Sequence, residues 1–231
     1  TLRDRSFARA YDSGNKDVDV VNDFLSPALC SGVRYDRLAG YFNSGALAAA
    51  ARGISEFVIN GGKMRVIASP QLSPKDLEIL QNVNSQSERL LIFRSALLSS
   101  VTNSDLLADE FERDHVAAMA WMLREGQLEI RIALAAEGQD ENTLFHQKVG
   151  VISDENGEQV SFSGSINETA AGWTKNIEEF KVFRSWKDAE SEFVMHDKEL
   201  FNRYWNAGQN ERVKVVPLEK AVFDELIKLA P

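Results

Sequence analysis

The chain has 231 residues, a formal net charge of −9 at pH 7 and 44% hydrophobic residues. These values predict a globular protein with one large or two small domains, and the lack of any run of about 18 apolar residues excludes a transmembrane helix. The acidic balance argues against a surface that coats nucleic acid, because such binding depends on neutralising phosphates, but it is compatible with a local basic cleft.

The cysteine content and the first residues bear on the cellular compartment. The single cysteine, Cys30, excludes an internal disulfide and is compatible with a reducing cytosol. The start, Thr1-Leu2-Arg3, has neither a Met nor an apolar h-region, so we expect no signal peptide and a start that has been trimmed. We therefore expect a cytoplasmic protein that does not bind membranes.

The first 31 residues predict an arm followed by a helix. Residues 1–16 are polar and contain Gly14 and Asn15, which predicts an extended or loosely packed arm. Asp17–Ser31 predicts a helix, in which Pro27 favours a kink or an early stop.

A strand–helix–strand pattern comes next. Val33–Phe42 predicts a strand, Ala46–Ile59 an Ala-rich helix and Lys63–Ala68 a second strand, which together indicate a β-α-β unit with parallel strands. Tyr41 and Phe42 lie at the carboxyl end of the first strand, where open α/β sheets place their ligands. We interpret this pair as substrate-binding, with the packing of two aromatic side chains as the alternative.

Residues 73–125 predict a helical insertion. Apolar residues recur at helical spacing through Ser87–Ser100 and Leu106–Arg124. The alternating sequence of Leu128–Leu134 then predicts a strand. A polar loop over 138–143 leads from that strand toward His146, and this position makes it a candidate substrate-contacting loop.

Three strands are predicted in the stretch that follows. Lys148–Ile152 and Gln159–Ser163 form a hairpin around the turn sequence DENG, and Glu179–Phe183 alternates as a third strand. Asn167–Gly172 predicts a short helical turn between the second and third strands. In an antiparallel hairpin the start of one strand lies beside the end of the other, so residues that flank these strands meet at one sheet edge.

The residues at that edge suit a phosphate ester. Lys148 supplies a positive charge, while Ser165 and Asn167 supply directed donors. His146 has a side-chain pKa near neutrality, so it can attack phosphorus or transfer a proton. Glu178 can accept the other ring N–H and so fix the tautomer of the histidine.

Together these residues form the pattern H-x-K … G-S-x-N … N-x-E, which resembles the motif of the nuclease-like phospholipase D superfamily. The resemblance implies a covalent phosphohistidine intermediate on His146. It also implies that Lys148, Ser165 and Asn167 bind the phosphoryl group and that Glu178 orients the histidine. It implies no metal and no cofactor.

The chain departs from the longer, lipase-type motif. Ser153 stands where that motif has an Asp, and we interpret the adjacent Asp154 as part of the turn. Glu179 is the alternative to Glu178, and the N-x-E spacing favours Glu178. A second H-x-K sequence begins at His196, but it lies in an amphipathic helical run with no G-S-x-N after it, so we interpret that histidine as a helix residue.

The remaining elements complete the predicted fold. Trp186–Ala207 predicts a long helix, Arg212–Val216 a short strand and Pro217–Leu229 a final helix. We predict an α/β fold with a mixed, mainly parallel sheet flanked by helices on both faces, as in phospholipase-D-like domains. We expect residues 1–231 to form a single domain excised from a longer chain.

A basic cleft would draw on scattered cations, for each of which a solvated surface position is the alternative. The candidates are Arg34, Arg37, Arg52, Lys63, Arg65, Lys148 and Lys175.

The sequence thus predicts a metal-independent phosphodiesterase, a nuclease that acts on DNA. Because the chain carries one complete motif and displacement at phosphorus needs two active groups, the resemblance implies a homodimer through the active-site face. LAGYFNSGAL and VFDELIKLAP are similar to phospholipase-D-like domains attached to DEAD/DEAH-type helicases or found in restriction systems, which implies a module of such a defence protein. The alternatives are a phospholipid or other phosphodiester hydrolase, and a non-catalytic module for nucleic-acid binding or dimerisation.

Overall fold

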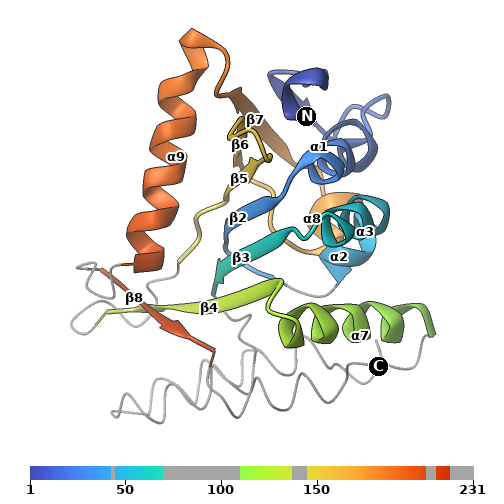
Figure 1. The fold of residues 1–231 in the computed structure, drawn as a ribbon, viewed down its shortest axis with the longest axis vertical. Coiled ribbons are helices and arrows are strands. Elements are labelled where there is room, and N and C mark those ends of the chain that lie inside the picture. Colours follow the sequence, from blue (N-terminus) through green and yellow to red (C-terminus); the bar gives the residue numbers. More distant parts are fainter. Residues whose placement is uncertain (43–44, 70–109, 137–144, 207–211, 219–231) are drawn as a thin grey trace.

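The structure is a computed structural model that describes residues 1–42, 45–69, 110–136, 145–206 and 212–218. The described residues form a single sheet of eight strands, which are β1 (Ala10–Asp12), β2 (Arg34–Ala39), β3 (Lys63–Ala68), β4 (Leu128–Ala135), β5 (Val149–Ser153), β6 (Gln159–Gly164), β7 (Glu179–Arg184) and β8 (Val213–Pro217). Their order across the sheet is β1-β7-β6-β5-β2-β3-β4-β8 (Figure 1).

The sheet is mixed, but the prediction that it is mainly parallel is wrong. Only the β2–β3 and β3–β4 pairs of the described sheet are parallel, and the first of these is the pair that the β-α-β pattern predicted. The other five neighbouring pairs are antiparallel. The reason is that β5, β6 and β7 form a meander whose first strand lies antiparallel to β2, and short antiparallel strands are added at both edges.

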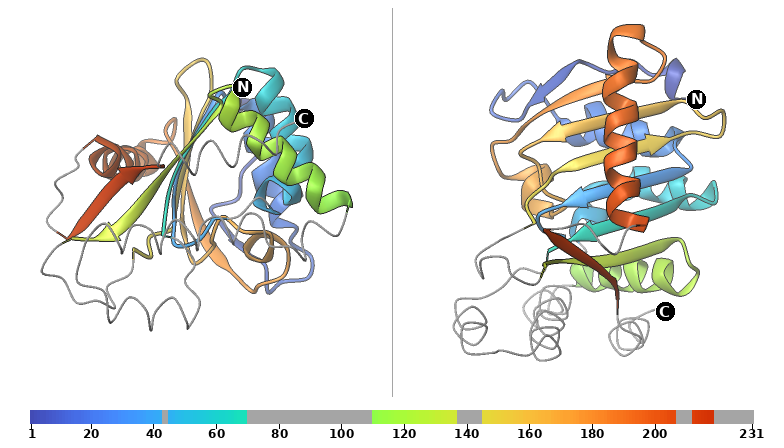
Figure 2. Two further views of the ribbon diagram at one scale, coloured as in Figure 1. Left: turned by 90° about the horizontal axis from the view of Figure 1, so that it is seen from below. Right: turned by 90° about the vertical axis from the view of Figure 1, so that its left-hand side faces the viewer.

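Helices cover both faces of the sheet, as predicted (Figures 1 and 2). One face carries α1 (Ser26–Ser31), α2 (Gly45–Ala49), α3 (Ala51–Ile59), α7 (Glu110–Arg124) and α8 (Ala170–Thr174). The opposite face carries α9 (Asp188–Asn206), which packs across β2, β5, β6 and β7.

The described residues form two apolar cores, which result from the alternation of side chains along the strands. On β2, Tyr35 belongs to the larger core beneath the five helices, whereas Leu38 belongs to the core beneath α9. On β3, Val66 and Ile67 divide in the same way. Successive side chains of a strand point to opposite faces, so a strand buried on both sides needs apolar residues throughout.

The N-terminal segment is packed against the sheet, so the prediction of a loose arm is wrong. β1 pairs antiparallel with β7 at the sheet edge. Leu2, Phe7 and Tyr11 are each at most 5% exposed and join the larger core. Three apolar residues among many polar ones were enough to anchor the segment, because they contribute area to a core built by distant residues.

The predicted helix over Asp17–Ser31 is shorter and changes type along its length. A π-helical segment, η2 (Val21–Leu25), leads into α1, and Pro27 lies in the first turn of α1. Proline has no N–H and cannot close the usual i→i−4 hydrogen bond, so the irregular turn lies where the sequence placed a kink.

Several predicted elements fall partly or wholly outside the described residues. Of the helical insertion, α7 is described, while 73–109 lies outside. The loop at 138–143 and the final helix from residue 219 onward also lie outside. Among the described residues, no helix is both long and apolar enough to cross a membrane.

Candidate active site

One edge of the sheet collects the residues of the predicted motif. The register places Val149 of β5 beside Leu38 of β2 on one side and beside Ser163 of β6 on the other. The carboxyl ends of β2 and β6 therefore lie beside the start of β5, and β7 begins beside the end of β6. The residues that flank these strand ends are His146, Lys148, Ser165, Asn167 and Glu178.

Three of these side chains converge over Gly40, the residue that follows β2. A Cβ atom placed on Gly40 would lie 2.9 Å from Asn167 Oδ1, 2.9 Å from His146 Cδ2 and 3.1 Å from Lys148 Nζ. The absence of a side chain at Gly40 is therefore what lets the imidazole, the ammonium and the amide meet. Gly40 lies within the predicted strand Val33–Phe42, and a glycine in a strand is a known mark of close approach.

The histidine ring is accessible and held at a lowered pKa. His146 is exposed, and the ring of Tyr41 packs edge-on against it with 6.1 Å between centroids. Partial burial, and secondarily the charge of Lys148, lowers the pKa of His146 below its usual value of 6.5. The imidazole is therefore neutral, and able to act as a nucleophile, at a lower pH than a free histidine.

Tyr41 also fixes the orientation of Asn167. The backbone N–H of Tyr41 donates to Asn167 Oδ1 at 3.1 Å, which identifies that atom as the amide oxygen. The amide nitrogen has no acceptor among the described residues and is free to donate to an anion. Phe42, the second predicted aromatic, is 4% exposed in the larger core, so only Tyr41 presents its ring at the site.

Lys148 carries its charge in a buried position. The residue is 8% exposed, and its Nζ donates to the carbonyl of His146 at 3.2 Å. Burial lowers the pKa of Lys148, the charge of Arg37 lowers it further, and Glu178 acts in the opposite direction. No carboxylate among the described residues forms an ion pair with Lys148, so two of its three N–H donors are available to a ligand.

A buried ion pair between Arg37 and Glu168 supports the G-S-x-N segment from the interior of the protein. Arg37 of β2 is 0% exposed, and its Nε donates to Glu168 Oε2 at 2.9 Å, which also accepts from the Tyr35 hydroxyl at 2.8 Å. The same guanidinium donates to the carbonyl of Ile166, which lies between the two predicted phosphate-binding residues. Burial, with the charge of Glu168, raises the pKa of Tyr35 well above its usual value, so Tyr35 acts as a donor.

Glu178 braces the serine of the motif. Its carboxylate accepts from the Ser165 hydroxyl at Oε2 and from Asn176 Nδ2 at Oε1, the latter at 3.0 Å. Its backbone N–H donates to Ser13 Oγ at 2.8 Å, which ties it to the segment after β1. No hydrogen bond joins Glu178 to His146 among the described contacts. The carboxylate instead lies within electrostatic reach of the site ammonium.

The two candidate carboxylates occupy different environments. Glu178 is 9% exposed, whereas Glu179 is exposed and forms an ion pair with Lys181. This difference follows from strand alternation, which sends neighbouring side chains to opposite faces.

Two further hydrogen bonds hold the H-x-K segment, one from a residue of α9 and one from the residue that follows β3. Gln147 Nε2 donates to the hydroxyl of Tyr204 at 3.1 Å. The hydroxyl of Ser69 donates to the carbonyl of Phe145 at 3.2 Å. These bonds flank His146 and limit the movement of the segment that carries it. No sequence signal marked Tyr204 or Ser69, because both lie far from the motif in the chain.

The other predicted cations are mostly engaged elsewhere. Arg34 and Arg65 both bond to Asp36, away from the site. Arg52 and Lys175 line a separate cavity, described below. Asp154 accepts hydrogen bonds from backbone N–H groups, including that of Leu2, which confirms its interpretation as a turn residue.

The second H-x-K sequence lies away from the candidate site. His196 is exposed on α9, on the opposite face of the sheet from α8. Within the described part of the chain, no group of three or more His, Cys, Asp or Glu side chains is arranged to hold a metal ion.

Comparison with known proteins gives matches to solved structures. No protein-family model matches the sequence, and no curated protein matches it. NucT from Helicobacter pylori is 16% identical with a TM-score of 0.48, covering 89% of this chain and 96% of its own. Nuc from Salmonella typhimurium, a phospholipase D family member, is 13% identical with a TM-score of 0.43, covering 86% and 91%.

A third solved structure is similar over only part of its length. Phosphatidylserine synthase from Haemophilus influenzae is 13% identical with a TM-score of 0.46, and the match covers 90% of this chain but 42% of that protein. At these identities and TM-scores, any functional interpretation has to come from the side chains of the site.

Proposed function

We propose that this protein is a phosphodiesterase of the phospholipase D superfamily that cleaves DNA through a covalent phosphohistidine. The observation that carries the proposal is the convergence of His146, Lys148 and Asn167 over Gly40. Cleavage of a phosphodiester needs a nucleophile and donors that bind the phosphate oxygens. This site places a nucleophile with a lowered pKa, a buried ammonium and a free amide donor within one side chain's reach.

The charge on the phosphate would be balanced by groups of the protein. Lys148 is buried and has no ion-pair partner among the described residues, so its charge acts on the ligand through a medium of low dielectric. Asn167 adds a directed donor on the same side. Donors that are already in place need no reorganisation during the reaction, which makes such stabilisation effective. The proposed reaction therefore requires no metal ion.

In the first step, the neutral imidazole of His146 attacks phosphorus. An N–P bond forms, the P–O bond to the leaving nucleoside breaks, and the leaving oxygen takes a proton from a general acid. In the second step, water attacks phosphorus, gives its proton to that same group, and the N–P bond breaks. We propose Glu178 as the carboxylate that orients the histidine during the reaction. In the described structure it is held at the site by its bonds to Ser165 and Asn176 and does not yet bond to His146.

The general acid would come from a second copy of the chain. The described residues hold one such motif, and a two-fold dimer through this face would set two copies of His146 around one phosphate. Sedimentation equilibrium tests this part of the proposal. A monomer at micromolar concentration with full activity would contradict it.

The decisive experiment is cleavage of single- and double-stranded DNA in excess chelator, with phospholipid vesicles tested alongside. His146→Ala should abolish cleavage, and His196→Ala is the matched control because it removes the other H-x-K histidine. A phosphohistidine trapped by rapid denaturation, labile in acid and stable in base, would identify the intermediate. DNA cleavage that survives His146→Ala, or that the chelator stops, would refute the mechanism. Cleavage of vesicles alone would assign the site to lipid.

The cellular context is a further part of the proposal. The similarity of LAGYFNSGAL and VFDELIKLAP to helicase-attached domains leads us to propose a module of a helicase or restriction system. The native protein should then purify with a DNA-stimulated ATPase, and its absence would contradict this context without affecting the site chemistry.

A further inference from the structure

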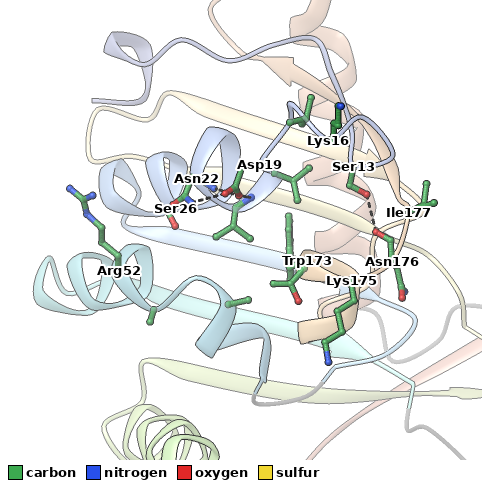
Figure 3. Close-up of a pocket in the computed structure, with 16 residues that line it drawn as sticks. Ser13, Lys16, Asp19, Asn22, Ser26, Arg52, Trp173, Lys175, Asn176 and Ile177 are labelled. Carbon is green, nitrogen blue, oxygen red and sulfur yellow. Dashed lines mark hydrogen bonds between the residues drawn. The ribbon is translucent and has the colours of Figure 1, made fainter.

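A cavity of about 590 Å³ lies on the helix-rich face of the sheet (Figure 3). It is bounded by the segment before α1, the junction of α2 and α3, and the end of α8. Lys16, Arg52 and Lys175 lie on different sides of it. These cations come from three separate segments of the chain.

The charge of this cavity is opposite to that of the chain. Its lining contains three cations and one acidic residue, Asp19, although the whole chain has a net charge of −9. The carboxylate of Asp19 is already used, since it accepts from the backbone N–H groups of Val21 and Asn22. Lys16, Arg52 and Lys175 form no ion pair with any described residue. The cavity is therefore a local positive site on an acidic protein.

A buried donor without a partner also lines the cavity. Trp173 is 2% exposed, and its indole Nε1 has no hydrogen-bond partner among the described residues. An unsatisfied buried donor is destabilising, and such a group in a native structure usually marks a missing acceptor. An anionic ligand whose binding uncovers this atom would provide that acceptor.

A short chain segment leads from the lining of this cavity to the candidate active site. Asn176 lines the cavity, and its side chain holds the carboxylate of Glu178. Lys175 is three residues before Glu178, so the two backbones are at most about 11 Å apart. Stacked nucleotides place one phosphate about every 3.4 Å along a strand, so a strand leaving the catalytic phosphate reaches Lys175 within a few nucleotides.

We propose that this cavity binds phosphates of the nucleic-acid strand that flank the scissile phosphate. This inference rests on the proposed function for the identity of the polymer. Three unpaired cations on different sides suit successive phosphates of one strand better than a single compact anion. Nearby Ile177, which is 82% exposed, offers an apolar surface to a base.

The test compares two double variants with the same change in charge. Arg52→Ala/Lys175→Ala removes two cations from the cavity, while Lys187→Ala/Lys198→Ala removes two exposed lysines next to and on α9, which covers the opposite face of the sheet. Both are made with His146→Ala to prevent cleavage. Binding of a fluorescent single-stranded ten-mer and of a dinucleotide is measured by anisotropy across salt concentrations.

The cavity variant should bind the ten-mer about five- to tenfold more weakly, with a salt slope reduced by about 1.4 if two phosphate contacts are lost. The dinucleotide should bind all variants alike, and the control should change ten-mer affinity by less than about twofold. Equal losses in both variants, or no loss in either, would overturn the proposal. So would weakened binding of AMP with unchanged binding of the ten-mer, which would assign the cavity to a free nucleotide.

The result of this binding test can be distinguished from the result of the cleavage test of the proposed function. The anisotropy comparison needs no cleavage, so a cavity effect would stand even if His146→Ala leaves DNA hydrolysis intact. Conversely, hydrolysis of bis(p-nitrophenyl) phosphate, which is too small to reach the cavity, should be unchanged by Arg52→Ala/Lys175→Ala when His146 is present.

Discussion

The substitution Gly40→Ala tests the geometry of the site most directly. Its added methyl would stand 2.9 Å from Asn167 Oδ1 and His146 Cδ2, and 3.1 Å from Lys148 Nζ. Ordinary contacts to carbon need about 3.5 Å, so each of the three groups would have to retreat by roughly half an ångström. The backbone of Gly40 does not have a positive φ, so the effect comes from the methyl group and not from the main chain.

The consequence should be large for activity and small for stability. A displacement of about 1 Å can cost about a hundredfold in rate, so a shift of half that size in three groups should lower phosphodiester hydrolysis at least tenfold. Overpacking costs about 1–3 kcal/mol, and the reduced entropy of the unfolded chain returns about 0.4–1 kcal/mol. We therefore expect a net loss of about 1 kcal/mol in urea unfolding.

Gly61→Ala is the matched control. Gly61 has a φ of +71°, and a Cβ there would meet nothing within 4 Å. Alanine in the left-handed region costs about 1–2 kcal/mol, so this variant should lose comparable stability while hydrolysis stays unchanged. If Gly40→Ala keeps wild-type hydrolysis and stability, the three side chains do not converge over residue 40 and the reasoning fails.

Three further predictions concern neighbouring groups. Glu178→Gln should lower the rate of hydrolysis about a hundredfold, whereas Glu179→Gln should change that rate by less than about threefold. Equal effects of the two substitutions would contradict the choice of Glu178 as the carboxylate that orients the histidine. In the free protein, NMR titration should give His146 a pKa below 6.5, because burial and the ammonium of Lys148 hold that pKa down. Lys148→Met should therefore raise the pKa of His146, and a wild-type value above 6.5 would disprove this explanation. Tyr204→Phe should cost about 1 kcal/mol in urea unfolding by removing an acceptor from the H-x-K segment, and unchanged stability would exclude that support.

Much of the local structure could be predicted from the sequence. The strands β5, β6 and β7 lie within one residue of their predicted ranges at each end, and the turn between the first two is held by Asp154 as expected. The β-α-β unit is likewise parallel as predicted. Strand periodicity and turn chemistry depend on neighbouring residues, so a single sequence contains the information.

The direction of β5 relative to β2 could not be predicted in the same way. The choice of a parallel or antiparallel neighbour depends on how distant strands dock, and no local pattern marks it. The prediction for the N-terminal segment was wrong for a related reason. Tyr11 is buried by its packing against Phe180 of β7 and not by its own neighbours in the chain.

By itself, the sequence determined which residue types meet at the site and which strands carry them. Only the tertiary structure showed what holds them there. The bonds from Tyr41 to Asn167, from Arg37 to Ile166 and from Glu178 to Ser13 join residues 126, 129 and 165 positions apart. A motif records short-range spacing, whereas these partners are selected by the close packing of distant segments around a glycine that leaves room for them.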